Sequence, residues 1–270
     1  MTAMTRAGWA GRWLILWIGV SVAVTVSVSL AWGHSMEATL NELRGTVNFI
    51  ERGSEQEKVV ALTFDDGPHP EYTYRILRIL NFYQAKATFF VVGTEVEKYP
   101  QWVKMANQLG MEIGSHTYEH FRLSLLSEEE ARYQIEQNQQ LIRSLVGYEP
   151  LFLRPPGGRV NGQVGRLAAE YGLVIAWWSY NSNDLSDRTA DEIYQSVVDS
   201  VEPGAIILFH DGSEETVKAL PRIIEELRRR GYRLVTMSEL YRTLPGADQS
   251  LLTQKGILSR PQTELASYGP

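Results

Sequence analysis

From residue 58 onward, short apolar runs rich in β-branched residues alternate with longer segments in which apolar residues recur every three or four positions. The apolar runs predict strands, and the spaced segments predict amphipathic helices. We expect seven strands, at 59–64, 87–92, 112–115, 151–154, 173–178, 205–210 and 233–236. We expect helices at 71–83, 95–109, 127–146, 162–171, 190–201 and 214–230, with a short one at 238–243.

An alternation of strands and helices predicts a parallel sheet with helices packed outside it. Seven units favour a closed or nearly closed barrel, with an open doubly wound sheet as the alternative. No glycine-rich phosphate loop follows the first strand, which weakens a nucleotide-binding version of the open sheet. Ser127 and Glu130 have the spacing of a capping box, so they mark the start of the third helix.

The N-terminal residues follow a different pattern. The 20 residues from Trp13 to Trp32 carry no charge, and a helix of that length rises about 30 Å, the thickness of the hydrocarbon core. Two arginines precede this stretch and two glutamates follow it, which predicts that the rest of the chain lies outside the cell. We expect residues 1–33 to be one transmembrane helix that anchors the protein in the cell membrane. The alternatives are a cleaved signal peptide with secretion, and a buried soluble helix.

Two further segments flank the alternating region, which we assign to one domain at 57–243. In the connector at 34–56, apolar residues at spacings of four and three predict a short amphipathic helix. These residues are Met36, Leu40, Leu43, Val47 and Ile50. The last segment, 244–270, is rich in Pro, Gly, Ser and Gln and is predicted to be a tail.

Composition narrows the class of protein. Hydrophobic residues make up 44% of the chain and charged residues 21%, as in globular proteins with a substantial core. The formal net charge of −6 argues against nucleic acid as a partner, because phosphate binding requires clustered Lys and Arg. The chain has no cysteine, which excludes disulfides, thiolate zinc sites and a cysteine nucleophile.

Polar residues gather where five of the predicted strands end. They are Asp65 and Asp66, His116 with His120 shortly after it, Arg154, Asp184 and the pair His210 and Asp211. In a parallel α/β barrel the active site lies at the carboxyl ends of the strands. We therefore expect these groups to converge on one rim.

Two histidines four residues apart, His116 and His120, are a weak signal alone. The zinc signature with this spacing has a glutamate directly after the first histidine. Thr117 occupies that position here, so the metalloprotease interpretation fails. Two imidazoles and one carboxylate would nevertheless leave a fourth position for water, as in catalytic zinc sites.

Adjacent carboxylates at a strand end cannot point the same way. We therefore expect one of Asp65 and Asp66 to bind the metal and the other to accept a proton from water. His210 could protonate the leaving group. These residue types predict metal-assisted hydrolysis of an amide or an ester.

Five ordered motifs within about 57–243 carry a family resemblance. They are Thr63–Pro68 (TFDDGP), Ser115–His120 (SHTYEH), Arg154–Pro156 (RPP), Asp184, and Leu208–His210 (LFH), and Ala87–Phe90 with Gly93 fits the second strand. Together they resemble the polysaccharide deacetylases of carbohydrate esterase family 4, which have the NodB homology domain. The resemblance implies a distorted (β/α)₇ barrel.

The resemblance also implies residue roles. Asp65 would be the general base and His210 the general acid. Asp66, His116 and His120 would bind a divalent metal, Zn²⁺ first, with Co²⁺, Mn²⁺ or Ni²⁺ as alternatives.

Three more positions take supporting roles from the resemblance. Arg154 would orient Asp65, and Asp184 would pair with His210. Leu208 would line the pocket for the acetyl methyl group.

Two positions depart from the family pattern. Gly157 replaces the usual tyrosine of the third motif, although its backbone N–H can still bind the oxyanion and so contact the substrate. Leu185 replaces the usual tryptophan after Asp184, which changes a wall of the pocket. Trp177 and Trp178 either compensate for this loss or belong to the core.

These features predict removal of N-acetyl groups from N-acetylglucosamine in a cell-wall polysaccharide, with peptidoglycan as the expected substrate. The alternatives are deacetylation of chitin oligomers, O-acetyl ester hydrolysis on xylan, and glycan binding by an impaired site. The expected partners are the polysaccharide and, through the N-terminal helix, the membrane.

Overall fold

The computed structural model describes residue 41 and residues 49–257, and the residues from 49 onward belong to one compact unit. Within these described residues, none of the helices combines the length and the hydropathy needed to cross a bilayer. The predicted anchor at 1–33 lies outside the described residues, as does nearly all of the connector before residue 49.

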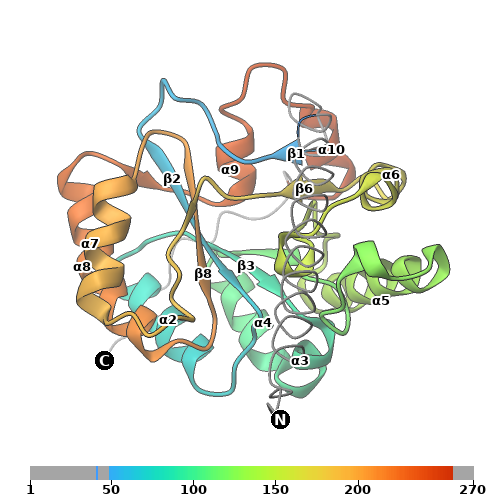
Figure 1. The fold of residues 1–270 in the computed structure, drawn as a ribbon, viewed down its shortest axis with the longest axis horizontal. Coiled ribbons are helices and arrows are strands. Elements are labelled where there is room, and N and C mark those ends of the chain that lie inside the picture. Colours follow the sequence, from blue (N-terminus) through green and yellow to red (C-terminus); the bar gives the residue numbers. More distant parts are fainter. Residues whose placement is uncertain (1–40, 42–48, 258–270) are drawn as a thin grey trace, which may run out of the picture. The chain divides into compact units, whose positions relative to one another are not determined.

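Nine strands form one sheet in the described part of the chain (Figure 1). They are β1 (Phe49–Ile50), β2 (Val59–Asp65), β3 (Thr88–Val91), β4 (Glu112–Ser115), β5 (Phe152–Leu153), β6 (Val174–Ala176), β7 (Tyr180–Asn181), β8 (Ala205–His210) and β9 (Arg233–Leu234). Their order is β1-β6-β5-β4-β3-β2-β8-β7, with β9 paired to β2. All of these pairs are parallel, as predicted.

The sheet is curled but does not close into the expected (β/α)₇ barrel. The predicted strand at 173–178 ends at Ala176, and the chain pairs again only as β7, this time with β8. The free edge of β6 pairs instead with β1. The last strand does not close the ring either, because β9 pairs with the start of β2, where Val60 has partners on both sides.

β1 corrects the predicted connector. Ile50 is buried in the core, and its carbonyl accepts a 2.7 Å hydrogen bond from the backbone N–H of Trp177. The apolar spacing that predicted a helix through Ile50 thus ends in a strand, because the exposed edge of β6 offers hydrogen bonds to an extended chain. The domain therefore begins before residue 57.

Helices cover the outside of the sheet (Figure 1). They are α2 (Tyr72–Phe82), α3 (Gly93–Lys98), α4 (Pro100–Gln108), α5 (Glu128–Val146), α6 (Gly162–Glu170), α7 (Ala190–Ser200), α8 (Glu214–Arg229), α9 (Met237–Tyr241) and α10 (Gln249–Gln254), with 3₁₀ turns η1 (Leu123–Leu125) and η2 (Pro156–Gly158). The capping box of Ser127 and Glu130 is confirmed at the start of α5. The single helix predicted at 95–109 is two helices, because Pro100 begins α4 and has no N–H to continue α3.

The predicted tail is wrong over 244–257. In α10, Leu252 is fully buried, and the ammonium of Lys255 donates to Glu149 at 3.0 Å and to the carbonyl of Tyr171 at 2.9 Å. The polar composition of the segment concealed this short helix, although Leu251, Leu252 and Ile257 pack into the core. Residues 258–270 lie outside the described part.

Successive side chains along β2 point to opposite faces of the sheet, one set into the apolar core and the other to the inner face. Val60, Leu62 and Phe64 pack into the apolar layer under α2 and α8. The intervening residues of the strand, Thr63 and Asp65, therefore point to the inner face of the curled sheet. The same alternation on β8 directs Leu208 and His210 inward, so the sheet brings acid–base groups together at the carboxyl ends of two neighbouring strands.

Candidate active site

Two carboxylates diverge where β2 ends. Asp65 is 3% exposed, and its Oδ1 accepts a hydrogen bond of 2.7 Å from Nη1 of Arg154. Asp66 has a φ of 71°, so the chain turns sharply after the strand and the second carboxylate leaves the direction of the first. Both carboxylates nevertheless lie near Nε2 of His116, with Oδ2 of Asp65 at 3.9 Å and Oδ1 of Asp66 at 3.2 Å.

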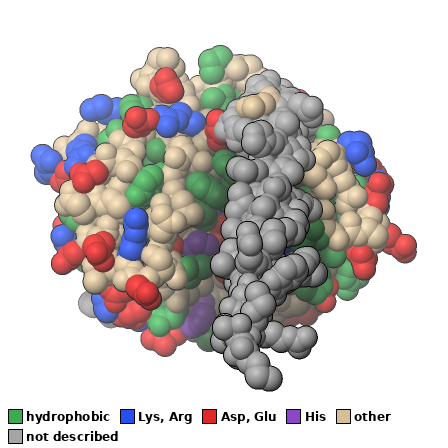
Figure 2. Space-filling view, in the orientation of Figure 1, with side chains coloured by type: hydrophobic (Ala, Val, Ile, Leu, Met, Phe, Trp, Pro, Cys, Tyr) green, Lys and Arg blue, Asp and Glu red, His purple; other side chains and the backbone are tan. Residues whose placement is uncertain are grey.

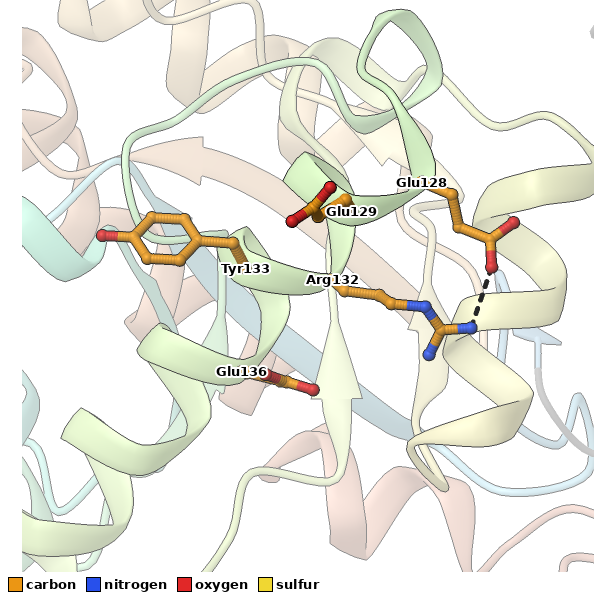
Figure 3. A pocket seen from close by; sticks show the side chains of 5 residues that line it. All are labelled: Glu128, Glu129, Arg132, Tyr133 and Glu136. Carbon is orange, nitrogen blue, oxygen red and sulfur yellow. Dashed lines mark hydrogen bonds and ion pairs between the residues drawn. The ribbon is translucent and has the colours of Figure 1, made fainter.

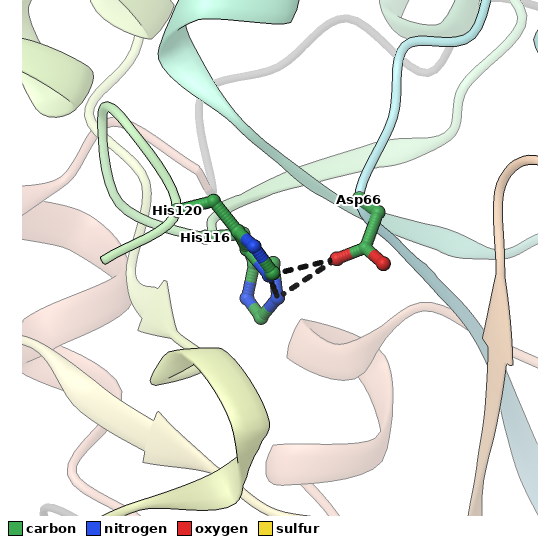
Figure 4. A group of neighbouring side chains, drawn as sticks. All are labelled: Asp66, His116 and His120. Atoms are coloured by element: carbon green, nitrogen blue, oxygen red, sulfur yellow. Dashed lines mark hydrogen bonds and ion pairs between the residues drawn. The ribbon is translucent and has the colours of Figure 1, made fainter. Parts of the chain in front are cut away.

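Asp66, His116 and His120 form a compact cluster (Figure 4). Oδ1 of Asp66 lies 3.2 Å from Nε2 of His116 and 3.0 Å from Nε2 of His120. The two Nε2 atoms are 3.2 Å apart. One ligand atom from each residue thus lies within 4.8 Å of the other two, and these residues could hold a metal ion.

The spacing of the two histidines does not come from a helix. His116 follows β4, and both Thr117 and His120 have left-handed backbones, with φ of 66° and 62°. The loop is held in place by backbone bonds from Gly93 to Thr117 and by the side chain of Gln134, which accepts a 2.7 Å bond from the N–H of Glu119. Two left-handed residues therefore bring the second imidazole back over the first.

A hydrogen bond orients the buried imidazole of His116. Its Nδ1 lies 2.6 Å from the carbonyl oxygen of Arg154, and only a protonated Nδ1 can donate to that oxygen. This tautomer leaves the lone pair of Nε2 directed at the cluster, as in metal-binding histidines whose other nitrogen is held by a backbone carbonyl.

The residues of the cluster shift one another's pKa values. Burial opposes ionisation of Asp66, but its contacts with the imidazoles of His116 and His120 outweigh burial and hold its pKa far below the usual range. The hydrogen bond with Asp66 raises the pKa of His120 against a smaller effect of burial. A carboxylate is thus present to neutralise positive charge at this point.

On the neighbouring strand, His210 pairs with Asp184. Oδ1 of Asp184 lies 2.8 Å from Nδ1 of the imidazole, and Oδ2 accepts 2.8 Å from the backbone N–H of His210 and 2.6 Å from Oγ1 of Thr216. Burial alone would lower the pKa of His210, but the bond to Asp184 raises it on balance. The carboxylate is buried, yet its bonds, chiefly that from His210, lower its pKa.

Arg154, which is fully buried, links the carboxylate of Asp65 to the sheet. Besides Asp65, its guanidinium donates to Oγ1 of Thr63 at 2.8 Å and to the carbonyls of Ala176 and Trp177 at 3.2 and 3.1 Å. Its charge also lies 4.0 Å from the centre of the Phe90 ring. Every contact fixes the orientation of the guanidinium, which in turn fixes Asp65.

Both positions where the sequence departs from the family pattern are exposed. Gly157 is exposed with a φ of 63°, and Leu185 is 64% exposed. The rings of Trp177 and Trp178 stack 4.5 Å apart against Gly158, where a Cβ would lie 2.6 Å from Trp178. The tryptophans are half-buried, so they combine a packing role with a partly open surface. Leu208 is buried on the inward face of β8.

Sequence reasoning placed Asp211 on the rim without giving it a role. Its backbone N–H donates to the carbonyl of Asp65 at 2.7 Å, and its Oδ2 accepts 2.6 Å from Thr73. Burial raises its pKa to about 7. A Cβ at Gly67 would lie 2.1 Å from this carboxyl, so the loop after Asp66 packs directly on it. The position of Asp211 directly after His210 was a sequence signal for this carboxyl. Its contact with Thr73 had no such signal, because the two residues are far apart in the sequence.

On the molecular surface, histidine side chains are visible near the middle of the face shown in Figure 2. A separate depression on α5 is lined by Glu128, Glu129, Arg132, Tyr133 and Glu136 (Figure 3). Its one cation, Arg132, is already paired with Glu128 and Glu170. This depression does not contain the acid–base groups and is not the candidate active site.

Comparison with known proteins decides the family. The family profile described as polysaccharide deacetylase matches residues 52–176. A peptidoglycan-N-acetylglucosamine deacetylase of Bacillus cereus is 41% identical over 191 residues, which cover 69% of this chain and 89% of that protein. The chain belongs to the polysaccharide deacetylase family, carbohydrate esterase family 4. It is accordingly a hydrolase that acts on polysaccharide.

Other relatives of this polysaccharide deacetylase agree in fold and class. A peptidoglycan-N-acetylmuramic acid deacetylase of Bacillus subtilis is 39% identical over 68% of this chain, although the match covers 39% of that longer protein. A crystal structure of a peptidoglycan N-acetylglucosamine deacetylase with 4-naphthalen-1-yl-N-oxidanyl-benzamide superposes with a TM-score of 0.71 and 37% identity, over 73% of this chain and 94% of that one. The curled parallel sheet is thus the family's fold.

Proposed function

We propose that this deacetylase removes N-acetyl groups from N-acetylglucosamine residues of peptidoglycan. The observation that carries the proposal is the pairing of Asp65 with His210. These residues are register partners on β2 and β8, and both point inward beside the histidine cluster. Similarity to relatives described as peptidoglycan deacetylases supports the choice of substrate.

The donor set at the cluster suits a divalent metal ion. Asp66, His116 and His120 provide one oxygen and two nitrogens that can converge on one point, and few protein ligands leave room for water and substrate. Zn²⁺ fits this set, and Co²⁺, Mn²⁺ and Ni²⁺ are alternatives. When bound, such an ion supplies Lewis acidity that polarises the acetyl carbonyl and makes a nearby water more acidic.

The protein's own groups then divide the proton transfers. Asp65 takes the proton from the attacking water, and Arg154 holds that carboxylate in its orientation. His210 gives a proton to the departing amine, and Asp184 holds its imidazole in position. The N–H of Gly157 donates to the oxygen that becomes negative in the transition state. Leu208 contacts the acetyl methyl group.

For location, we propose that the protein is anchored in the cell membrane with its catalytic domain outside. The support is the uncharged stretch from Trp13 to Trp32 and the arginines before it. This placement would bring the domain to the cell's own wall before any other polysaccharide.

The direct test measures acetate released by the purified full chain from peptidoglycan, chitin oligomers and acetylxylan. We expect release from peptidoglycan, with the new free amines on glucosamine identified by mass spectrometry. Asp65→Asn should lower kcat by about 10²-fold or more, because general base catalysis contributes that much. Release only from acetylxylan would replace our substrate assignment.

Metal dependence is tested on the same protein. Removal of metal with a chelator should abolish acetate release, and Zn²⁺ should restore it. His116→Ala should also lose bound metal by elemental analysis, while His69→Ala, which changes a histidine outside the cluster, should keep it. Metal content that is unchanged in His116→Ala would disprove the ligand set.

A further inference from the structure

Arg122 is an exposed cation beside the active site. It follows His120 by two residues in the same loop. Among the described residues, no carboxylate lies within ion-pair distance of its guanidinium, and none of their polar groups accepts a hydrogen bond from its side chain. Arg132 and Arg154, by contrast, are both paired with carboxylates.

The guanidinium of Arg122 lies over Gly157. A Cβ built at Gly157 would be 3.4 Å from Nε and 3.9 Å from Nη2 of Arg122. A Cβ there would be in ordinary van der Waals contact with the guanidinium, so the cation borders the space beside Gly157. Gly157 follows Arg154, whose carbonyl holds His116, by three residues, so the cation lies between the two loops that carry and support the histidine cluster.

The loop that carries Arg122 is held by the segment that follows Gly157. The side-chain amide of Asn161 donates to the carbonyl of Ser124 at 3.2 Å, and that of Gln163 donates to the carbonyl of Leu126 at 3.2 Å. Leu123, the next residue after Arg122, is fully buried. The backbone that presents the cation is thus fixed relative to the glycine loop.

A planar guanidinium with free donors matches a carboxylate in a two-point hydrogen bond. We infer that Arg122 binds a carboxylate of the glycan next to the reacting sugar and so makes the enzyme selective for acidic strands. The inference rests on the proposed function. Peptidoglycan carries carboxylates on its stem peptides, and on the lactyl groups where no stem peptide is attached, whereas the backbones of chitin and xylan are neutral.

The test compares two forms of one substrate. Glycan strands of alternating N-acetylglucosamine and N-acetylmuramic acid are used with free lactyl carboxylates, or with those carboxylates converted to methylamides. We expect the full-length, metal-loaded protein to prefer the acidic strands, and Arg122→Gln to lower the ratio of kcat/KM values about tenfold, the effect of losing one charged hydrogen bond. Added salt should weaken the wild-type preference.

Arg78→Gln, which removes an exposed arginine of α2, should leave the ratio unchanged. Equal losses on both strands in Arg122→Gln, or no loss on either, would overturn the inference while leaving the proposed function intact. If wild type releases no acetate from either form, the proposed function fails. Affinity of the two strand forms for wild type and Arg122→Gln, measured by calorimetry, then decides the carboxylate contact separately. The same tenfold difference is expected there, and its absence would refute the contact.

Discussion

At the scale of single residues, the site is governed by buried charges that are each paired. Asp65 and Asp184 are almost fully buried, but one is bonded to Arg154 and the other to His210. A buried carboxylate without such a partner would be protonated or would destabilise the fold. The bond from His210 lowers the pKa of Asp184, and the guanidinium of Arg154 gives Asp65 a buried partner of opposite charge.

The pair of Asp184 and His210 makes a prediction about pH. His210 must hold a proton to act as the acid, and the carboxylate raises its pKa, so activity is lost only as pH rises through that raised value. Asp184→Asn removes the largest of the contributions that oppose the effect of burial on the pKa of His210. The basic limb of the kcat/KM profile should therefore move to lower pH, and kcat should fall by about 10²-fold or more.

The control is Asp187→Asn, because Asp187 is an exposed carboxylate on the same loop. Its profile should match that of the wild type. A basic limb that stays in place in Asp184→Asn would show that another group acts as the acid.

At the scale of elements, loops with left-handed residues give the site its shape. Thr117 and His120 return the second imidazole to the first, and η2 turns at Gly157 and Gly158 so that the wall of Trp177 and Trp178 can approach closely. The two loops follow β4 and β5, whose residues are all buried.

Gly158→Ala tests the close approach. The new methyl group would lie 2.6 Å from Trp178, and the φ of 63° is unfavourable for alanine, so we expect a loss of about 2 kcal/mol in the free energy of unfolding. Gly110→Ala is the matched control, since Gly110 has a φ of 78° but open space around its Cβ position. Urea denaturation should show the smaller loss in the control; equal losses would mean that packing against the tryptophans adds nothing.

At the scale of the whole molecule, segments outside the predicted domain complete its core. β1 comes from the connector and α10 from the predicted tail. Both pack into a second buried apolar cluster, which contains Phe152 and Tyr241 and is separate from the layer under α2 and α8. The compact unit therefore extends at both ends beyond the region that the strand and helix pattern identifies.

Leu252→Ala measures the contribution of α10. The side chain is fully buried, so its truncation should destabilise the protein by about 3 kcal/mol. Leu185→Ala, at an exposed leucine, should change stability by less than about 0.5 kcal/mol. Thermal denaturation separates the two outcomes, and equal midpoints would mean that α10 is not part of the cooperative unit.

How far the sequence could predict this structure depends on the range of the contacts. Asp66, His116 and His120 could be grouped because each follows a strand, and parallel strands end at one edge. Whether the sheet closes into a barrel could not be predicted. It depends on the pairing of Ile50 with β6, and the sequence pattern instead assigned Ile50 to a helix. The contacts of Asp211 with Thr73, and of Arg122 with Gly157, join residues that only the folded chain brings together.

The pairing of β1 with β6 also bears on how the domain can be produced. A fragment that begins at residue 57, where the strand and helix pattern starts, would lack the backbone partner of Trp177 and expose the edge of a buried parallel sheet. Exposed edges of this kind template association with other chains. Solubility of the isolated catalytic domain thus depends on a two-residue strand that lies outside all of its sequence motifs.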